Sequence, residues 1–306
     1  MVSPQSERVR QFLLGEKNAP LAPLDVQRKN LDTLSERLVG HPVPLPEGTQ
    51  IEKAVVAGIP GEWISFPTSD RERVLLYLHG GAYMLGSCDS HRELVARLSA
   101  ATGIRAFLPE YRLAPEHLFP TAVEDAHAVY RELLAQGIRP EHIVVAGDSA
   151  GGGLTLALLL TIRDAGDPMS AGAVLLSPWT DLAGTGESMA TRADIDPWLN
   201  AGSITAVGQF YAGQTDVHDP RVSPVYADLH NLPSLLIETG DDEILLDDTT
   251  RIVQHAQKAG VDVQVHIWQG MWHVFPSFAF LIEEGQQAIE EISTFVRTHT
   301  ALPSHE

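Results

Sequence analysis

The sequence predicts an α/β protein with a mostly parallel sheet, and three observations lead to this fold class. Short apolar runs recur along the chain, and helical stretches lie between them. Because strands that are covered on both faces lack the alternation of half-exposed strands, this rhythm is typical of a parallel sheet. The length of 306 residues also fits one α/β domain, although length alone would suggest two.

The order of the predicted elements follows from periodicity and from helix breakers. Apolar residues recur near helical spacing over 24–38, and Gly40 with three following prolines ends this helical region. Residues 51–66 are expected to form two short strands around a turn at 59–61. Buried strands are predicted at 74–78, 105–108, 143–146, 173–176, 235–238 and 263–267. Helices are predicted at 90–102, 122–136, 152–165, 246–259 and 278–299.

One segment, 182–225, departs from this rhythm. It has no clear strand, and its residues include Gly184, Gly186, Met189, Trp198, Phe210 and Tyr211. An insertion between two strands at the carboxyl edge of a sheet is a natural lid. The alternative is a structural excursion that only covers the sheet.

Composition excludes several classes of function. The chain has 21 basic and 40 acidic residues, a net charge of −19, which disfavours binding to nucleic acid or to anionic membranes. Its one cysteine, Cys88, excludes an internal disulfide and a thiolate metal cluster. The first residues lack an apolar signal region, and the longest apolar run, 154–162, is too short to span a bilayer. We therefore expect a cytoplasmic protein.

A nucleophile candidate lies where the third buried strand meets its helix. The stretch 143–154 has the pattern strand, Gly-Asp148-Ser149-Ala150-Gly, helix. A serine on such a tight turn exposes its hydroxyl, and the helix N-terminus points at the developing oxyanion. The alternative is a glycine-rich turn that packs or binds phosphate, but neither a Gly-Lys-Ser/Thr sequence nor the dinucleotide-binding glycine spacing is present.

A second glycine-rich stretch, His79-Gly80-Gly81, follows the strand predicted at 74–78. An acyl-transfer enzyme needs backbone N–H donors where the carbonyl oxygen becomes negative. In α/β-hydrolases, one donor comes from this loop and another from the residue after the nucleophile, here Ala150. We expect His79 to support the loop and to take no part in proton transfer.

The acid and the base should follow the serine in the chain order Ser, Asp or Glu, His. The strand at 235–238 leads into Asp241, Asp242 and Glu243, and the strand at 263–267 leads into His273. Asp242 is the preferred acid and Asp241 the second choice. The carboxylate should orient the imidazole and stabilise its protonated form.

These motifs resemble the hormone-sensitive-lipase-like family of α/β-hydrolases, the bacterial family IV esterases. The resemblance rests on four segments in order: His79-Gly-Gly, Tyr111-Arg-Leu-Ala-Pro-Glu-His117, Gly147-Asp-Ser-Ala-Gly-Gly152 and Gly270-Met-Trp-His273. Two departures are evident. Ala82 stands where the family often has a third glycine, and the acid motif lacks the family's proline.

The resemblance implies a sheet of about eight strands with a helical cap. Residues 1–45 would add helices to the cap, 182–225 would be the cap insertion, and 46–181 with 226–306 would form the catalytic domain. It also implies that Gly80, Gly81 and Ala150 bind the oxyanion, with His79 and Asp148 as supporting residues. The segment 111–116 would brace the oxyanion loop from below.

The predicted function is a serine carboxylesterase that acts on short- to medium-chain esters through Ser149, His273 and Asp242. No metal and no cofactor is expected. Alternatives are a lactone or acylated-xenobiotic hydrolase, an acyltransferase or amidase with the same triad, and a non-catalytic ligand-binding relative. The expected partner is a small-molecule ester, without nucleic acid or membrane, and a homodimer is a further expectation. Apolar residues near the predicted site, either an acyl pocket or ordinary core, are Met84, Leu85, Trp179, Trp198, Phe210 and Tyr211.

Overall fold

The computed structural model describes residues 3–301 and contains one sheet of eight strands. Its strand order is β1-β2-β4-β3-β5-β6-β7-β8. β1 and β2 run antiparallel to their neighbours, and the strands from β4 to β8 are parallel. The predicted α/β fold is therefore confirmed. The strands are β1 (Gln50–Val56), β2 (Ile59–Ser65), β3 (Asp70–Leu78), β4 (Ile104–Pro109), β5 (Ile143–Asp148), β6 (Gly172–Leu176), β7 (Leu235–Gly240) and β8 (Val263–Trp268).

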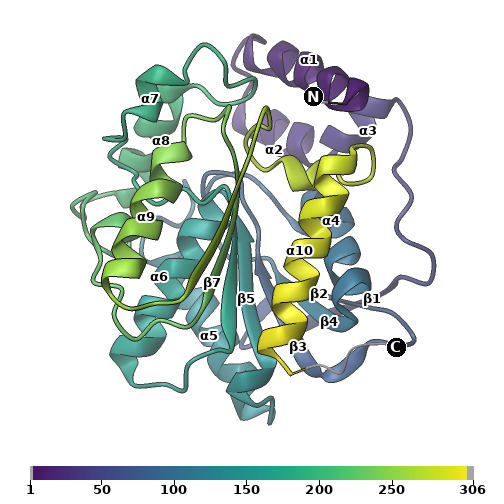
Figure 1. Ribbon diagram of the computed structural model, residues 1–306, viewed down its shortest axis with the longest axis vertical. Coiled ribbons are helices and arrows are strands. Elements are labelled where there is room, and N and C mark those ends of the chain that lie inside the picture. The colour runs from purple at the N-terminus through teal and green to yellow at the C-terminus, as the bar shows by residue number, and fades with distance from the viewer. Residues whose placement is uncertain (1–2, 302–306) are drawn as a thin grey trace.

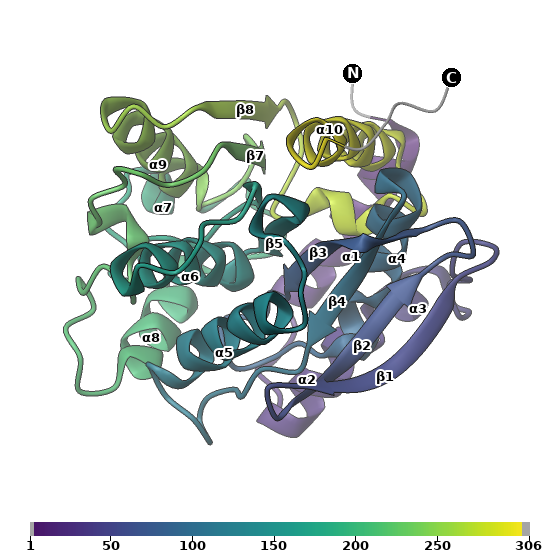
Figure 2. The same cartoon turned by 90° about the horizontal axis from the view of Figure 1, so that it is seen from below.

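Helices cover both faces of the sheet (Figures 1 and 2). On one face lie α4 (Cys88–Thr102) and α10 (Glu283–His299), which pack against each other. On the other lie α5 (Thr121–Ala135), α6 (Ala150–Ala165) and α9 (Leu246–Lys258). Alternate residues of β3 divide between the faces, because Leu75 and Tyr77 join the α4–α10 core while Leu76 and Leu78 join the α5–α6 core.

Two sequence predictions differ from the observed elements. The turn between β1 and β2 lies at Ala57-Gly58, before the predicted 59–61, because both of these residues adopt positive φ angles. The helix predicted at 278–299 begins only at Glu283, as α10, and a 3-10 turn, η3 (Phe275–Phe278), precedes it. The buried Ile282 has an extended backbone that separates them.

The remaining helices gather above one end of the sheet (Figure 1). Three come from the N-terminal region: α1 (Pro4–Lys17), α2 (Leu24–Asp32) and α3 (Leu34–Val39), which ends at the left-handed Gly40. The segment 182–225 contributes α7 (Ser188–Thr191), α8 (Ala201–Ala212) and part of the turn η2 (Pro224–Tyr226), with no strand. We refer to the N-terminal helices and the 182–225 segment together as the cap.

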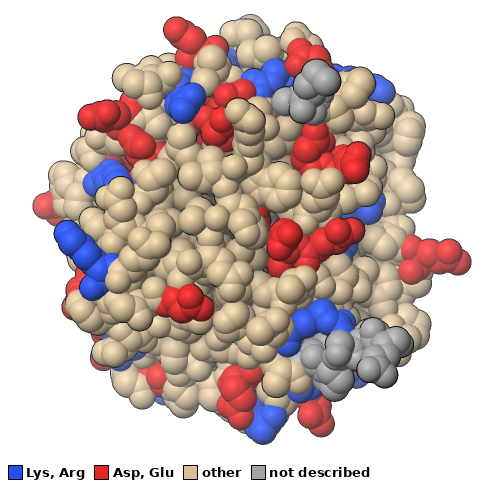
Figure 3. Space-filling view, viewed as in Figure 1, with Lys and Arg blue, Asp and Glu red and all other residues tan. Residues whose placement is uncertain are grey.

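Charged side chains are spread over the surface in small groups, and the face in Figure 3 displays more acidic than basic ones. This distribution agrees with the net charge of −19. None of the helices between residues 3 and 301 has the length and apolarity needed to cross a membrane.

Candidate active site

Ser149 lies on a sharp turn between β5 and α6. Its φ of 53° and ψ of −121° are uncommon for a residue with a side chain. The backbone of Ser149 is bonded on both sides, since its N–H donates to the Leu176 carbonyl at 2.8 Å and its carbonyl accepts from Trp179 N–H at 2.8 Å. Gly151 allows a close approach, because a Cβ there would overlap the Leu78 carbonyl oxygen. The turn therefore presents the hydroxyl from a fixed backbone.

His273 follows β8, and its acidic partner is Glu243. The Nδ1 atom of His273 lies 2.7 Å from Oε2 of Glu243, and both side chains are buried. The other carboxylate oxygen of Glu243 accepts hydrogen bonds from Ser177 Oγ at 2.8 Å, Thr239 Oγ1 at 2.5 Å and Gly240 N–H at 2.8 Å. Both oxygens of this buried carboxylate are thus satisfied, which is what a buried charge requires.

The structure pairs His273 with Glu243, whereas the sequence favoured Asp242 as the acid. Asp242 instead forms a salt bridge of 2.6 Å with Arg10 of α1. Asp241, the second choice, accepts a hydrogen bond from Gly270 N–H at 2.6 Å. The three acidic residues follow one another around a turn, so each points in a different direction. Their order in the sequence does not reveal which one reaches the imidazole.

Glu243 also controls the protonation of His273. Burial alone would lower the pKa of His273, but the hydrogen bond and the charge of Glu243 outweigh burial and raise the pKa above its usual value. His273 and Ser149 line the same cavity, and the ring of Trp198 lies edge-on to the imidazole at 6.1 Å. A base beside a nucleophile, oriented by a third group, is the arrangement of a Ser-His-acid triad.

The glycine loop after β3 differs in one respect from the prediction. The N–H of Gly80 donates to Asp148 Oδ1 at 3.0 Å, so it is not free to bind an oxyanion. In the part of the chain that the structure describes, the N–H groups of Gly81 and Ala82 have no hydrogen-bond acceptor, and both residues line the cavity with Ser149. Gly81 is required here, because its φ is +117° and a Cβ would overlap the Leu85 carbonyl oxygen.

Asp148 forms the centre of a buried network beneath this loop. Besides Gly80 N–H, its carboxylate accepts from the Tyr77 hydroxyl at 2.9 Å and lies 3.3 Å from Nε2 of His91. Burial would raise the pKa of Asp148, but the charge and hydrogen bond of His91 and the hydrogen bond of Tyr77 outweigh it and lower the pKa. Tyr77 and His91 were not among the predicted site residues, and only the strand and helix that carry them were visible in the sequence.

His79 is buried beneath the glycine loop and is in contact with Tyr111. Its ring stacks on Tyr111 at 4.3 Å, the Tyr111 hydroxyl donates to the His79 carbonyl at 2.6 Å, and Ala114 N–H donates to the Tyr83 carbonyl at 2.9 Å. Burial, followed by the nearby His91, lowers the pKa of His79 to about 3. His79 is therefore neutral at pH 7 and lies outside the set of residues that line the cavity with Ser149.

The cavity at Ser149 has a volume of about 180 Å³ and is mostly apolar. An outer cavity of about 460 Å³ adjoins it, since Leu31, Leu34, Ala82, Leu85, Trp198, Leu199 and Ile204 line both. Of the apolar candidates from the sequence, Leu85 and Trp198 therefore belong to the site. Trp179 and Tyr211 are buried in the core, Met84 packs against that core, and Phe210 is exposed.

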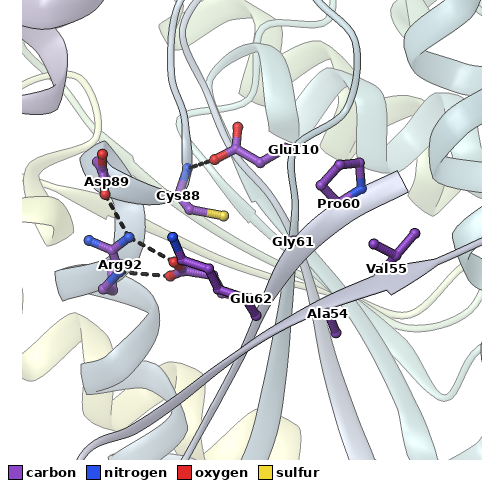
Figure 4. A pocket seen from close by; sticks show the side chains of 10 residues that line it. Ala54, Val55, Pro60, Gly61, Glu62, Cys88, Asp89, Arg92 and Glu110 are labelled. Carbon is purple, nitrogen blue, oxygen red and sulfur yellow. Dashed lines mark hydrogen bonds and ion pairs between the residues drawn. The ribbon is translucent and has the colours of Figure 1, made fainter. Parts of the chain in front are cut away.

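A separate cavity of about 450 Å³ lies between β1, β2 and the start of α4 (Figure 4). It contains Cys88, whose buried thiol donates to the Leu108 carbonyl and whose pKa is raised by burial and by Glu110. Arg92 in the same cavity is paired with Glu62 and Asp89. This cavity shares no lining residue with the Ser149 cavity, and a thiol with a raised pKa is a poor nucleophile.

Comparison with known proteins identifies the family of the chain. A family model described as the alpha/beta hydrolase fold matches residues 75–277. An acetyl-hydrolase of Streptomyces hygroscopicus is 40% identical over 300 residues, which cover 98% of each chain. An esterase of Acinetobacter venetianus is 36% identical over 276 residues, or 90% of this chain and 89% of that protein.

Solved structures are similar over nearly the whole length. The crystal structure of an esterase from the bacterial hormone-sensitive lipase family superimposes with a TM-score of 0.94 at 41% identity, and the match covers 98% of this chain and 99% of that chain. A hormone-sensitive lipase from a metagenome library has a TM-score of 0.92 at 34% identity, with the same coverage.

Proposed function

The chain belongs to the hormone-sensitive-lipase-like family of α/β-hydrolases and is a carboxylic ester hydrolase, and from this premise we propose that Ser149, His273 and Glu243 are its catalytic triad. The observation that carries the proposal is the buried 2.7 Å contact between His273 Nδ1 and Glu243. His273 in turn lines one cavity together with Ser149. We further propose that the N–H groups of Gly81, Ala82 and Ala150 bind the oxyanion.

In the first half of the reaction, Nε2 of His273 takes the proton of the Ser149 hydroxyl as its oxygen attacks the ester carbonyl. The carbonyl oxygen becomes negative and accepts hydrogen bonds from the three N–H groups. Glu243 stabilises the imidazolium without accepting its proton. When the intermediate collapses, the bond to the alcohol oxygen breaks, His273 protonates that oxygen, and Ser149 remains acylated.

In the second half, water repeats these steps on the acyl-enzyme. His273 takes a proton from the water as its oxygen attacks the acyl carbon. Collapse of the second intermediate breaks the bond to Ser149, and His273 returns the proton to the serine oxygen. The carboxylic acid leaves, and the enzyme regains its starting state.

We propose that the natural substrate is an ester with a short acyl group. The cavity at Ser149, about 180 Å³, is smaller than the ~300–1,000 Å³ typical of sites for drug-sized ligands. The larger outer cavity offers room for the other part of the ester. The name acetyl-hydrolase, given to the relative from Streptomyces hygroscopicus, also supports a short acyl group.

Ser149→Ala tests the nucleophile. The variant should fold like the wild type and lose about 10⁴-fold or more of its kcat with p-nitrophenyl acetate, because the remaining groups cannot form the acyl-enzyme. A fluorophosphonate probe should label the wild type and leave the variant unlabelled. Wild-type turnover in the variant would contradict the assignment, and wild-type protein that neither reacts with the probe nor cleaves esters would favour the alternative of a ligand-binding relative.

Acyl-chain length tests the substrate proposal. With p-nitrophenyl esters, kcat/KM should be higher for chains of two to about six carbons than for chains beyond about ten, because a long chain exceeds the inner cavity. The opposite order would contradict a short-acyl substrate. The same assays with an amide, with a lactone, and with an ester plus added alcohol test the alternatives of an amidase, a lactonase and an acyltransferase. An esterase should hydrolyse the simple esters fastest.

A homodimer also remains a proposal. β8 forms one edge of the sheet, and Ile267 on it is exposed. An apolar side chain on an exposed edge strand favours pairing with a second copy. Sedimentation equilibrium tests this directly, and a species of 33.3 kDa alone would contradict the dimer.

A further inference from the structure

The loop that carries Glu243 is bonded to the cap on its outer side. The N–H of Ile244, the residue after Glu243, donates to Oδ2 of Asp196 at 2.9 Å. Ser188 Oγ donates to the Ile244 carbonyl at 2.6 Å and accepts from Asp247 N–H at 3.0 Å. Both Asp196 and Ser188 belong to the 182–225 segment of the cap. The backbone directly after the proposed acid is therefore anchored by residues that lie outside the sheet.

Asp196 is connected to the substrate cavity as well. Its other carboxylate oxygen accepts the N–H groups of Trp198 and Leu199, each at 2.8 Å, and the side chain is completely buried. Trp198 and Leu199 both line the cavity that contains Ser149. One carboxylate thus holds two residues of the cavity wall with one oxygen and the acid loop with the other.

The charge of Asp196 also acts on His273. Three carboxylates influence the imidazole: Glu243 from the acid loop, Asp148 from β5 and Asp196 from the cap, and each favours its protonated form. The ring of Trp198 lies beside the imidazole and carries no charge. Removing the charge of Asp196 should therefore lower the pKa of His273, in addition to any change in the loop.

We propose that Asp196 is a positioning residue that joins the acid loop to the wall of the substrate cavity, so that the orientation of Glu243 and the position of Trp198 and Leu199 are set together. This proposal deepens the proposed function, since it rests on Glu243 as the triad acid. Asp196 reaches the reaction through Ile244 and Glu243, and its loss should affect kcat more than KM.

Asp196→Asn tests the link. The new amide nitrogen would either face Ile244 N–H or displace the contacts to Trp198 and Leu199, since an amide has one acceptor oxygen where the carboxylate has two. We expect kcat with p-nitrophenyl acetate to fall about 10- to 100-fold and KM to change less than about threefold. The acid limb of the pH–rate profile should move to lower pH by several tenths of a unit, about what a partly shielded charge near a histidine produces.

Asp181→Asn is the matched control. Asp181 is also a buried carboxylate at the boundary of the same segment, but its partners are Thr185, Tyr226 and Arg251, away from the acid loop. This variant should have a lower free energy of unfolding, and the acid limb of its pH–rate profile should stay at the wild-type pH. Ser188→Ala is a milder change on the acid loop itself, and it should lower kcat about threefold while the acid limb stays in place, because no charge is removed.

A readout without catalysis separates this proposal from the proposed function. The proton on His273 Nδ1 should give a downfield NMR resonance, assigned by its absence in His273→Gln, whose pH titration reports the contact with Glu243. In Asp196→Asn, the resonance should shift and titrate at lower pH. The proposal is overturned if the His273 resonance titrates in Asp196→Asn as it does in the wild type, or if Asp181→Asn shifts that titration equally. Absence of esterase activity in the wild type would instead contradict the proposed function.

Discussion

The two halves of the active site are held in place by different parts of the molecule. The half with Ser149 and the glycine loop is organised chiefly inside the sheet domain, where Asp148 binds Gly80 N–H and the Tyr77 hydroxyl. The half with Glu243 and His273 is tied to the cap through Asp196, Ser188 and Arg10. The Ser149 half therefore rests on contacts within the sheet domain, whereas the loops of Glu243 and His273 have contacts both to that domain, through Ser177, and to the cap.

Arg10 illustrates the second kind of support. Its guanidinium donates to Asp242, to the Gly270 carbonyl at 2.7 Å and to the Ile195 carbonyl at 3.1 Å. One side chain of α1 thus connects the acid loop, the loop before His273 and the cap insertion. From this difference we expect substitutions in the Asp148 network to disturb the oxyanion loop and the stability of the fold. Substitutions of the cap residues that contact the acid loop should disturb the positions of Glu243 and His273.

The largest effect is expected from the acid itself. Glu243→Gln should lower kcat/KM about 10³- to 10⁴-fold, because the imidazole loses the charge that fixes its tautomer and stabilises its protonated form. Asp242→Asn should cost less than about tenfold, because Asp242 contacts Arg10 and not His273. Kinetics of the two variants with p-nitrophenyl acetate decide between the residues, and a larger loss in Asp242→Asn would reverse the assignment.

The core network should give the next largest effect. Asp148→Ala removes the acceptor of Gly80 N–H and of the Tyr77 hydroxyl, and it should lower kcat about 10²-fold and the free energy of unfolding by about 2–3 kcal/mol. Tyr77→Phe removes one hydrogen bond only and should cost about 1 kcal/mol with kcat nearly unchanged. Urea unfolding and kinetics of both variants test this, and wild-type kcat in a folded Asp148→Ala protein would contradict a role in the oxyanion loop.

Loss of the salt bridge to α1 should have a smaller effect. Arg10→Met should lower kcat about threefold and stability by about 0.5–1 kcal/mol, because the pair with Asp242 is partly exposed. The control is Arg37→Met, since Arg37 forms a partly exposed pair with Glu16 within the N-terminal helices. That variant should lower stability by a comparable amount and leave kcat unchanged. Equal losses of kcat in both would indicate a general effect of the cap.

The smallest expected effect is on the pH dependence of the wild type. His273 must be neutral to accept the serine proton, so kcat/KM rises as the imidazole loses its proton. Because Glu243 raises the pKa of His273, the acid limb should have its midpoint above the ordinary 6.5. In Glu243→Gln the residual activity should have its midpoint at lower pH. A wild-type midpoint well below 6.5 would contradict the close contact with Glu243.

Much of the fold could be predicted because its signals are local. Apolar runs indicated the buried strands, and the segment Gly147 to Gly151 indicated a serine on a strand-to-helix turn. The choice among Asp241, Asp242 and Glu243 could not be made in this way. It depends on Arg10, which is 232 residues from Asp242 in the sequence, and on Ser177, which is 66 residues from Glu243.

The oxyanion donors that we propose differ from the predicted set in one residue, for a similar reason. A glycine pair after a strand predicts exposed N–H groups. The N–H of Gly80, however, donates to Asp148, and this hydrogen bond joins the ends of two strands that are distant in the sequence. Ala82 was interpreted as a departure from the family pattern. In the structure it has a φ of 55°, so a residue with a side chain adopts the left-handed backbone that a third glycine would have adopted easily.

The attachment of the acid loop to the cap has a consequence for recombination between relatives. A cap exchanged alone could bring different residues against the acid loop, while the loop would keep the Ile244 N–H that binds Asp196 and the Asp242 carboxylate that binds Arg10. Chimeras that keep activity should therefore inherit residues 241–247 together with the cap. The unit that can be exchanged is then discontinuous in sequence, and its boundary separates Ser149 from Glu243 within the proposed triad.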